Sequence, residues 1–433
     1  NKLSNNKKVY ALNAYKHAAS FNFDYTLQED AAFNHAKLVY ENVTSYTDAV
    51  TVFNEFLQNF PNSINIGFIQ DYLINAYSLS KNYKEGLSEL DKLEVLTFEQ
   101  QEAYQRMAYF RAVELFNDDL LELAFQYFNK SLQHPISEQY KALCYYWKGE
   151  AYYILGQFSE SIKEYEKFIY SPGSLYLPEY INVYYSLGYA NHNKQAYSKS
   201  IKWFRKYIDN VNIDHKKLND SYLRIADAYF MTNKYTRAND YYSKSESLDL
   251  FDVDYSIYQQ AQCFGLNGSL VEKEKSLKKL IQKYPSSHYS ADAKFDLANI
   301  HLTRNLHLDA LDIFEDIISN HPYSYLVKSS LLKSALSYYN LDQYDKAIAH
   351  FEQVIKDYPS TNESAEALVG LKNIYIDNGD VNIYFDYITT LSDVSVSAGA
   401  QDTITYQAAE MLYAKNENEK ALSAFEEYIQ KFP

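Results

Sequence analysis

Apolar and polar positions along this chain follow helical spacing, and the same short pattern returns many times. A small residue is followed four positions later by an aromatic residue, and three positions after that comes another apolar or small residue. Steps of four and three place the three side chains on one face of a helix. Clear copies are Ala49-Phe53-Phe56, Ala310-Phe314-Ile317 and Ala347-Phe351-Val354. Each copy therefore predicts an amphipathic helix whose small residue lets a neighbouring helix approach closely, while the aromatic ring fills the space beyond it.

The prolines give the period of this pattern. Pro285, Pro322 and Pro359 are each 37 residues apart, and Pro433 lies 74 residues after Pro359. A tyrosine often occurs about 22 residues before the proline, and an Asn or Gly between it and the next pattern is typical of a turn between two helices. We therefore expect an all-α fold of helix-turn-helix repeats with a period of about 37 residues, in which each repeat contacts only its neighbours.

The residues of one repeat resemble the tetratricopeptide repeat. The best match runs through Tyr145–Tyr152, the turn at Gly156, and then Ser161, Tyr165 and Phe168. This family has a small residue and a tyrosine in its first helix, and a small residue followed four positions later by an aromatic one in its second. The resemblance implies a right-handed α-solenoid, or superhelix, that acts as a scaffold. The period of about 37 residues, against the usual 34, predicts longer turns between repeats.

We divide the chain into a trailing helix at residues 1–29 and eleven consecutive repeats at residues 30–433. Ala11, Tyr15 and Ala18 show the spacing of a second helix, but no first helix precedes them. This indicates that the chain begins in the middle of a repeat, as a fragment of a longer array.

The last repeat ends on a consensus proline, and no polar capping helix follows it. We therefore expect a cap beyond the fragment, or a partner covering the last helix, which includes an end-to-end or homo-oligomeric contact. Loops are expected at residues 171–174, 211–217 and 391–403, where the superhelix could bend.

Composition and charge exclude several classes of function. The 433 residues carry a net charge of −15, whereas nucleic-acid binding requires many Lys and Arg residues against phosphate. Apolar residues make up 47% of the chain, which disfavours disorder, yet no run of 18 apolar residues predicts a membrane span. Cys144 and Cys263 are the only cysteines, too few for a disulfide framework or a four-cysteine zinc site.

Motifs for catalysis, cofactors and metals are missing from the sequence. There is no phosphate-binding loop, His-Glu-x-x-His or Gly-x-Ser-x-Gly. Gly265–Ser269 has no lysine and is interpreted as a turn, Asp252–Asp254 lacks the later ligands of a calcium loop, and the ten histidines are scattered. We therefore expect no enzyme activity, no cofactor and no metal site within these residues.

The aromatic residues are more numerous than a helical core needs, with 46 Tyr and 24 Phe. In the resembled family the first helix of each repeat lines a concave groove, and tyrosine is common in binding surfaces because it offers wide contact at little entropic cost. Two other readings remain: the tyrosines pack against adjacent helices, or a low-GC genome favours tyrosine codons. The predicted partner-binding residues of the groove are Tyr109, Phe116, Tyr146, Glu150, Tyr153, Tyr185, Tyr189, Asp227, Phe230, Tyr258 and Phe295.

These observations favour a non-enzymatic protein-protein interaction scaffold whose aromatic, acidic groove prefers a basic or apolar segment. A glycan- or peptidoglycan-binding module is the alternative, and a local cluster of aromatic and acidic residues would favour it over the even spread seen in the sequence. A third reading is a regulatory arm of a larger protein.

A second resemblance gives an expected cellular location for the protein. The closing segments Tyr284–Ser287 and Tyr358–Thr361 resemble those of bacterial envelope proteins, such as the outer-membrane assembly lipoprotein and the Tol-associated periplasmic type. The resemblance implies a periplasmic protein associated with the outer membrane, with envelope complex components as partners. A cytoplasmic location is the alternative.

Overall fold

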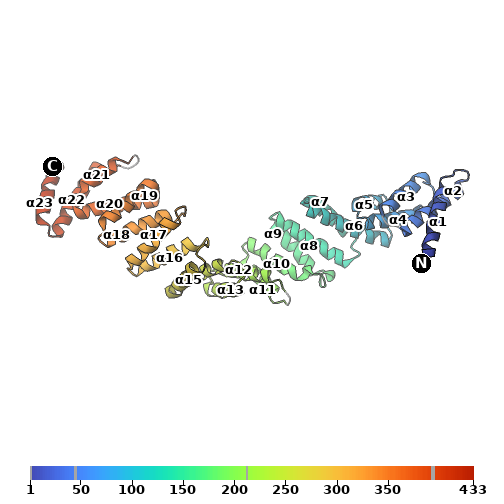
Figure 1. Cartoon of the computed structure of the whole chain (residues 1–433), viewed down its shortest axis with the longest axis horizontal. Helices are drawn as coiled ribbons and strands as arrows, with labels where there is room; N and C mark the ends of the chain where they lie inside the picture. Colours follow the sequence, from blue (N-terminus) through green and yellow to red (C-terminus); the bar gives the residue numbers. More distant parts are fainter. Residues whose placement is uncertain (1, 43–45, 211–212, 392–394) are drawn as a thin grey trace. The chain divides into compact units, whose positions relative to one another are not determined.

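The computed structural model describes residues 2–42, 46–210, 213–391 and 395–433 (Figure 1). Over these ranges the chain forms 23 α-helices and one short 3₁₀ helix, and no β-strand. The predicted all-α solenoid of successive helix pairs is confirmed.

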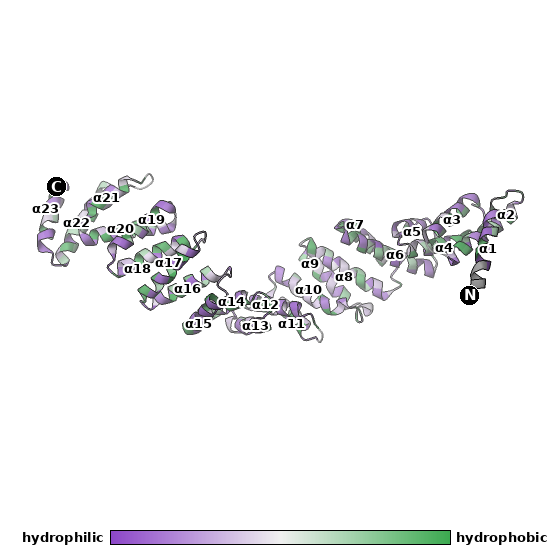
Figure 2. Ribbon diagram, viewed as in Figure 1, coloured by the Kyte–Doolittle hydropathy of each residue, from purple (hydrophilic) through white to green (hydrophobic). Residues whose placement is uncertain are grey.

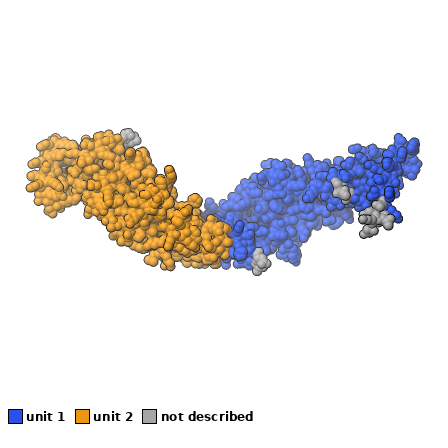
Figure 3. All heavy atoms as spheres, in the orientation of Figure 1, with its two compact units in different colours: residues 1–228 blue, residues 229–433 orange. Residues whose placement is uncertain are grey.

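Two compact units divide the chain at residue 228, and each is described by itself (Figure 3). The helices of the first unit are α1 (Lys2–Ala19), α2 (Tyr25–Glu41), α3 (Tyr46–Asn59), α4 (Ile66–Leu79), α5 (Tyr83–Leu90), α6 (Phe98–Asn117), α7 (Leu121–Gln133), α8 (Glu138–Ile154), α9 (Phe158–Ile169), the 3₁₀ helix η1 (Pro172–Ser174), α10 (Glu179–Asn193), α11 (Tyr197–Ile208) and most of α12 (His215–Met231).

The second unit begins within the last turn of α12. Its helices are α13 (Tyr235–Leu248), α14 (Val253–Leu266), α15 (Leu270–Lys283), α16 (Ser290–Thr303), α17 (His307–Asn320), α18 (Val327–Asn340), α19 (Tyr344–Asp357), α20 (Asn362–Asn378), α21 (Val381–Thr389), α22 (Ala398–Ala414) and α23 (Asn418–Lys431).

Helix pairs stack in sequence order within each unit. Successive helices pack against each other, as α6 packs on α7 and α17 on α18, and the first helix of one pair also touches the first helix of the next, as α6 touches α8 and α18 touches α20. Hydrophobic and hydrophilic residues share the individual helices, as Figure 2 shows. The small and aromatic residues of the repeated pattern form the core: Ala49, Phe53, Ala310 and Phe314 have no exposed surface. The packing role predicted for this pattern is confirmed.

Glycine in a first helix permits the closest approach of its partner helix. A Cβ atom on Gly149 of α8 would lie 2.5 Å from the ring of Tyr165 in α9, and one on Gly188 of α10 would lie 2.7 Å from Phe204 in α11. Both rings are fully buried. The ring of the second helix therefore rests directly on the backbone of the first.

Each of the three predicted loops includes residues that are helical in the structure. Residues 171–174 include the 3₁₀ helix η1, which packs on α8 and buries Ser171 and Ser174, because their hydroxyl groups bond to nearby carbonyl oxygens. Residues 391–403 were expected as one loop, but α22 already begins at Ala398, with Ser397 accepting a hydrogen bond as its N-cap.

Parts of these loops are outside the described residues, namely 211–212 and 392–394. The remainder of the loop expected at 211–217 is also short, because α12 begins at His215.

The predicted repeat boundaries are compatible with the helix order but stay a prediction. After α1, the 22 remaining α-helices of the described residues form eleven successive pairs from α2 to α23. None of the described helices is both long enough and apolar enough to span a lipid bilayer.

Candidate functional site

A hollow of about 260 Å³ lies in the first unit, where tyrosines of α8 and α10 face each other beside α9. The residues that line it are Glu150, Tyr153, Tyr165, Tyr185, Ser186 and Tyr189. Four of the eleven groove residues predicted from the sequence are therefore brought together: Glu150, Tyr153, Tyr185 and Tyr189. The hollow is thus built mainly from the first helices of two successive repeats.

Glu150 is the acidic group of the lining. Its Oε1 atom accepts a hydrogen bond from Tyr165 Oη at 2.7 Å and another from Ser186 Oγ at 2.9 Å. Burial and the Glu150 carboxylate raise the pKa of Tyr165 well above its ordinary value, so this hydroxyl remains a hydrogen-bond donor. Glu150 thereby ties α8 to α9 and to the next first helix, α10.

Asp220 of α12 holds the two tyrosines of α10. Its Oδ2 atom accepts from Tyr185 Oη at 2.8 Å and from Tyr189 Oη at 2.5 Å. Burial, followed by the interaction with Asp220, raises the pKa of both hydroxyls, which therefore stay protonated at neutral pH. Arg224 contacts Asp220 on the same helix and donates to Asp227 Oδ2 at 2.6 Å.

The aromatic walls are fixed by ring packing. The rings of Tyr185 and Tyr189 lie 5.1 Å apart at 69°, and both meet the buried ring of Phe204 edge to face. Tyr153 accepts a hydrogen bond from Asn193 Nδ2 at 3.0 Å and packs against Phe158. The rings and the hydroxyl groups that line the hollow are therefore both held in place by neighbouring side chains.

Other predicted groove residues in α6 and α8 serve packing. Tyr109 is only 8% exposed, lies against Phe128 and Tyr140, and accepts a hydrogen bond from Trp147 Nε1 at 3.2 Å. The packing alternative therefore holds for Tyr109, whose ring is not available to a partner. Phe116 meets Trp147 edge to face, and the half-buried Tyr146 contacts Trp147, Tyr165 and Phe168.

The last four predicted residues lie elsewhere. Asp227 pairs with Arg224, and Phe230, at the start of the second unit, meets Tyr235 at 5.4 Å. Further along the second unit, Tyr258 stacks on Tyr289 at 5.2 Å and Phe295 meets Phe314 at 5.7 Å. Of the predicted groove residues, Glu150, Tyr153, Tyr185 and Tyr189 are the ones that share the hollow of α8 and α10, and their partner-binding role stays a prediction.

The sequence analysis did not assign Tyr165 and Ser186 to a site. Tyr165 is the aromatic residue of the core pattern, and its hydroxyl bonds to Glu150 in the lining of the hollow. Ser186 lies 36 residues after Glu150, close to one period, so the repeat register could have paired the two.

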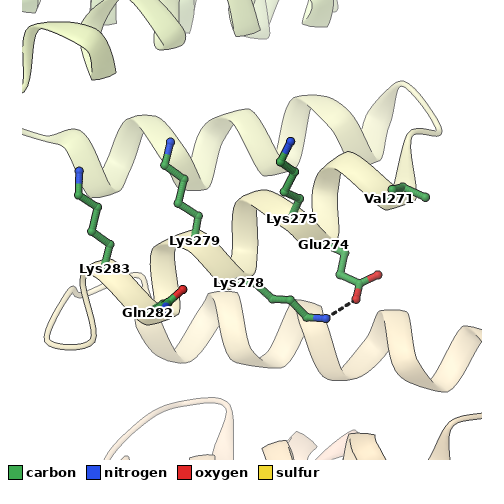
Figure 4. A pocket seen from close by; sticks show the side chains of 7 residues that line it. All are labelled: Val271, Glu274, Lys275, Lys278, Lys279, Gln282 and Lys283. Carbon is green, nitrogen blue, oxygen red and sulfur yellow. Dashed lines mark hydrogen bonds and ion pairs between the residues drawn. The ribbon is translucent and has the colours of Figure 1, made fainter.

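A second recess, of about 760 Å³, runs along α15 in the second unit. Lys275, Lys279 and Lys283 follow each other at intervals of four and extend toward the same side (Figure 4). Lys279 pairs with Glu246, and Glu274 binds both Lys278 and Arg304 at 2.6 Å. The recess is a partly neutralised surface between long side chains, and no groove residue predicted from the sequence lines it.

The described parts of the chain contain no cluster of metal ligands, and the two cysteine thiols are buried. No group of three or more His, Cys, Asp or Glu residues there is placed to hold a metal ion. Cys144 and Cys263 are free and buried, and burial raises the pKa of each thiol to about 12. Both thiols are therefore protonated at neutral pH. The expectation that the chain is not an enzyme stays a prediction.

Comparisons with known proteins bear on the fold and family. A family model described as tetratricopeptide repeat matches residues 220–245, 255–287, 329–361 and 405–433, and a second model of the same description matches residues 142–172. No protein of curated function matches the sequence.

Three solved structures are similar at low identity. The C-terminal part of a TPR repeat-containing protein from Cytophaga hutchinsonii is 18% identical, with 61% of this chain and 99% of that chain covered and a TM-score of 0.49. YrrB, described as a TPR protein with an unusual peptide-binding site, is 12% identical over 48% of this chain and 96% of its own, with a TM-score of 0.35. PilF of Pseudomonas aeruginosa is 18% identical over 50% of this chain and 95% of its own, with a TM-score of 0.34.

The segments that the family models match fall on five helix pairs of the structure: α8 with α9, α12 with α13, α14 with α15, α18 with α19, and α22 with α23. Four of the five matched segments carry the small-then-aromatic pattern, and in three of these all of its residues are buried. These five segments of the chain are therefore tetratricopeptide repeats.

Proposed function

We propose that this protein is a non-enzymatic scaffold that binds a segment of a partner protein at the tyrosine-lined hollow of α8 and α10. The observation that carries the proposal is the preorganised cluster of Tyr153, Tyr185 and Tyr189 on successive first helices. Aromatic side chains with a polar tip supply much of the binding energy of protein interfaces, and these lose little entropy because their hydroxyls are already held.

The partner segment should be basic or apolar. The protein has a net charge of −15, and carboxylates adjoin the hollow, so an acidic segment would be repelled. Partner association should also weaken as salt rises, because screening shortens the reach of surface charge.

Photo-crosslinking tests this function directly. A benzoylphenylalanine residue in place of Tyr153 should capture a specific partner from an extract of the source organism, whereas the same residue in place of Tyr176, which is 89% exposed and outside the hollow, should not. Tyr189→Ala should abolish the capture at position 153. Equal capture at both positions would contradict binding at the hollow.

A glycan-binding module is the second candidate, and the local clustering of three tyrosines with Glu150 supports it. Tyr185 and Tyr189 stand at 69° to each other, however, so they form no flat platform for a sugar ring. Retention of cell-wall fragments with no crosslinked protein, lost on Tyr189→Ala, would favour this candidate over the scaffold.

We also propose a bacterial envelope location, in the periplasm and associated with the outer membrane, with envelope complex components as partners. Support comes from the closing segments Tyr284–Ser287 and Tyr358–Thr361, whose pattern resembles that of envelope proteins. Fractionation of the source cells, followed by detection with an antibody to this protein, tests the location. Recovery with cytoplasmic markers alone would overturn it.

A further inference from the structure

The negative charge of Glu150 has no positive partner. The groups that bond to this carboxylate are hydroxyls: Tyr165 and Ser186 donate to Oε1, and Tyr146 also interacts with it. Within the described residues, no Lys, Arg or His side chain lies at ion-pair distance from it. A half-buried carboxylate usually has a charged partner, because desolvation disfavours the ionised group.

The carboxylate of Glu179 has an oxygen atom without a hydrogen-bond partner among the described residues. Glu179 lies in the first turn of α10, and this oxygen is its buried Oε2 atom. Together with Glu150 it raises the pKa of Tyr146, after the larger effect of burial, so both charges act on the same part of α8. Among the described residues, neither Glu150 nor Glu179 forms an ion pair with a basic side chain.

The aromatic walls are also suited to a cation. The face of an electron-rich ring attracts a positive group within about 6 Å of its centre. Tyr185 shows this behaviour already, because Lys217 Nζ lies 5.3 Å from its ring centre while donating to Asn182 Oδ1 at 3.0 Å. The hydroxyls of Tyr185 and Tyr189 donate to Asp220, and both residues line the hollow together with Glu150, so an incoming positive group would meet rings and a carboxylate there.

The size of the hollow limits the occupant. Its volume of about 260 Å³ is below the roughly 300–1,000 Å³ of pockets for drug-sized ligands. A single long side chain with a charged end fits that space. An apolar side chain would bury Glu150 still further without a partner, and an acidic one would be repelled.

We propose that the hollow receives one arginine or lysine side chain of the partner segment, with its positive group between Glu150 and the rings of Tyr185 and Tyr189. This inference rests on the proposed scaffold function and names the chemistry that the site recognises. An arginine makes the fuller contact, because its planar group both stacks on a ring and donates to a carboxylate.

Peptide selection followed by binding measurements tests the inference. Random displayed dodecapeptides are selected on the full chain, and those whose binding is lost with Tyr189→Ala are made as fluorescent peptides. Fluorescence anisotropy then gives the Kd. We expect the selected peptides to share a basic residue at one constant position. If that residue is an arginine, its replacement by citrulline should raise the Kd at least tenfold. If it is a lysine, replacement by norleucine should do the same.

Glu150→Gln completes the experiment. The glutamine oxygen can still accept from Tyr165 and Ser186, so the fold should be preserved, as circular dichroism would check. We expect Glu150→Gln to weaken the basic peptide about tenfold but to leave the citrulline or norleucine peptide within twofold. Glu166→Gln removes the same charge from an exposed position on α9 and should change neither Kd.

The outcomes separate the two proposals. Peptides that depend on Tyr189 but bind equally well after the uncharged replacement would overturn the cation inference and leave the scaffold function intact. If no selected peptide depends on Tyr189, the proposed function at this hollow fails, and the inference fails with it.

Discussion

Single glycines decide how closely the helices of one repeat can pack. In α8 and α10, Gly149 and Gly188 lie under the rings of Tyr165 and Phe204, which have no exposed surface. Since protein interiors are close-packed, a ring in this position cannot move aside without displacing further side chains.

Replacing Gly188 with alanine should therefore destabilise the protein. The added Cβ atom would lie 2.7 Å from Phe204, and overpacking of this kind costs about 1–3 kcal/mol. Gly67→Ala is the matched control, because nothing lies within 4 Å of its Cβ and alanine favours a helix by about 0.5–1 kcal/mol. Guanidinium unfolding followed by circular dichroism compares the two, and a Gly188→Ala variant as stable as Gly67→Ala would contradict the packing.

Tyrosine hydroxyls bonded to carboxylates should make stability depend on alkaline pH. Tyr339 donates to Asp377 at 2.6 Å, and this bond, with burial, raises the tyrosine pKa to about 12. An unfolded tyrosine loses its proton near pH 10, so between pH 10 and 12 the folded state binds more protons. The contribution is complete below pH 10 and is lost as pH rises through about 12.

Tyr339→Phe should accordingly make the loss of stability between pH 10 and 12 less steep, as urea unfolding at a series of pH values would show. Tyr323→Phe, at a fully exposed residue of the same unit, serves as the control and should keep the wild-type slope. An unchanged slope in Tyr339→Phe would rule out this hydrogen bond as a source of the pH dependence.

At the scale of the helix, hydrogen bonds join each repeat to the next at a nearly constant separation. Ser186 reaches Glu150 across 36 residues, Ser329 reaches Glu363 across 34, and Tyr339 reaches Asp377 across 38. These separations are close to the period of about 37 residues predicted from the prolines. Many of the tyrosine and acidic side chains of the first helices therefore hold neighbouring repeats together, which accounts for part of their abundance.

Gln105 provides the most buried of these links in the first unit. It is fully buried in α6, where its Nε2 donates to the Ser137 carbonyl at 2.9 Å and its Oε1 accepts from the Ser137 amide at 2.6 Å. The side chain thus satisfies the Ser137 amide and gives the Ser137 carbonyl a second donor beside the Lys141 amide.

Gln105→Ala should destabilise the start of α8 by about 1–3 kcal/mol, because the Ser137 amide loses its partner, whereas the Ser137 carbonyl still accepts from the Lys141 amide. Amide hydrogen exchange should be faster over the first turn of α8. Gln126→Ala, at an exposed position of α7, is expected to have no such effect, and equal exchange in the two variants would argue against the link.

At the scale of the whole molecule, stability should be distributed repeat by repeat. Helices contact their neighbours along the chain, and long-range contacts inside each unit join adjacent pairs. A solenoid of this kind behaves approximately as a chain of nearest-neighbour interactions.

The exchange pattern of Gly188→Ala tests this behaviour. Loss of protection should be largest in α9, α10 and α11 and should fade with distance along the chain, so that α16 to α19 keep wild-type protection. A uniform loss over both units would indicate one cooperative unit instead.

The sequence alone determined the helices, their pairing and their period, because helix formation and turns depend on residues only a few positions apart. The spacing of Ala310 and Phe314 was enough to place them in the core, and Pro285, Pro322 and Pro359 were enough to set the repeat. Loop lengths were less predictable. A loop was expected at residues 391–403, but α22 begins at Ala398 because Ser397 caps it, and this local capping signal was not used in the prediction.

Only the tertiary structure decided which aromatic residues are available to a partner. Tyr109 and Tyr189 occupy the same face in the repeat register, yet Tyr109 is covered by Phe128 and Tyr140, whereas Tyr189 lines the hollow. The difference depends on side chains of other helices, about 20 to 35 residues away in sequence, such as Asp220 for Tyr189. The exposure of a side chain is set by the helices that pack around it, and helical spacing within one repeat does not contain that information.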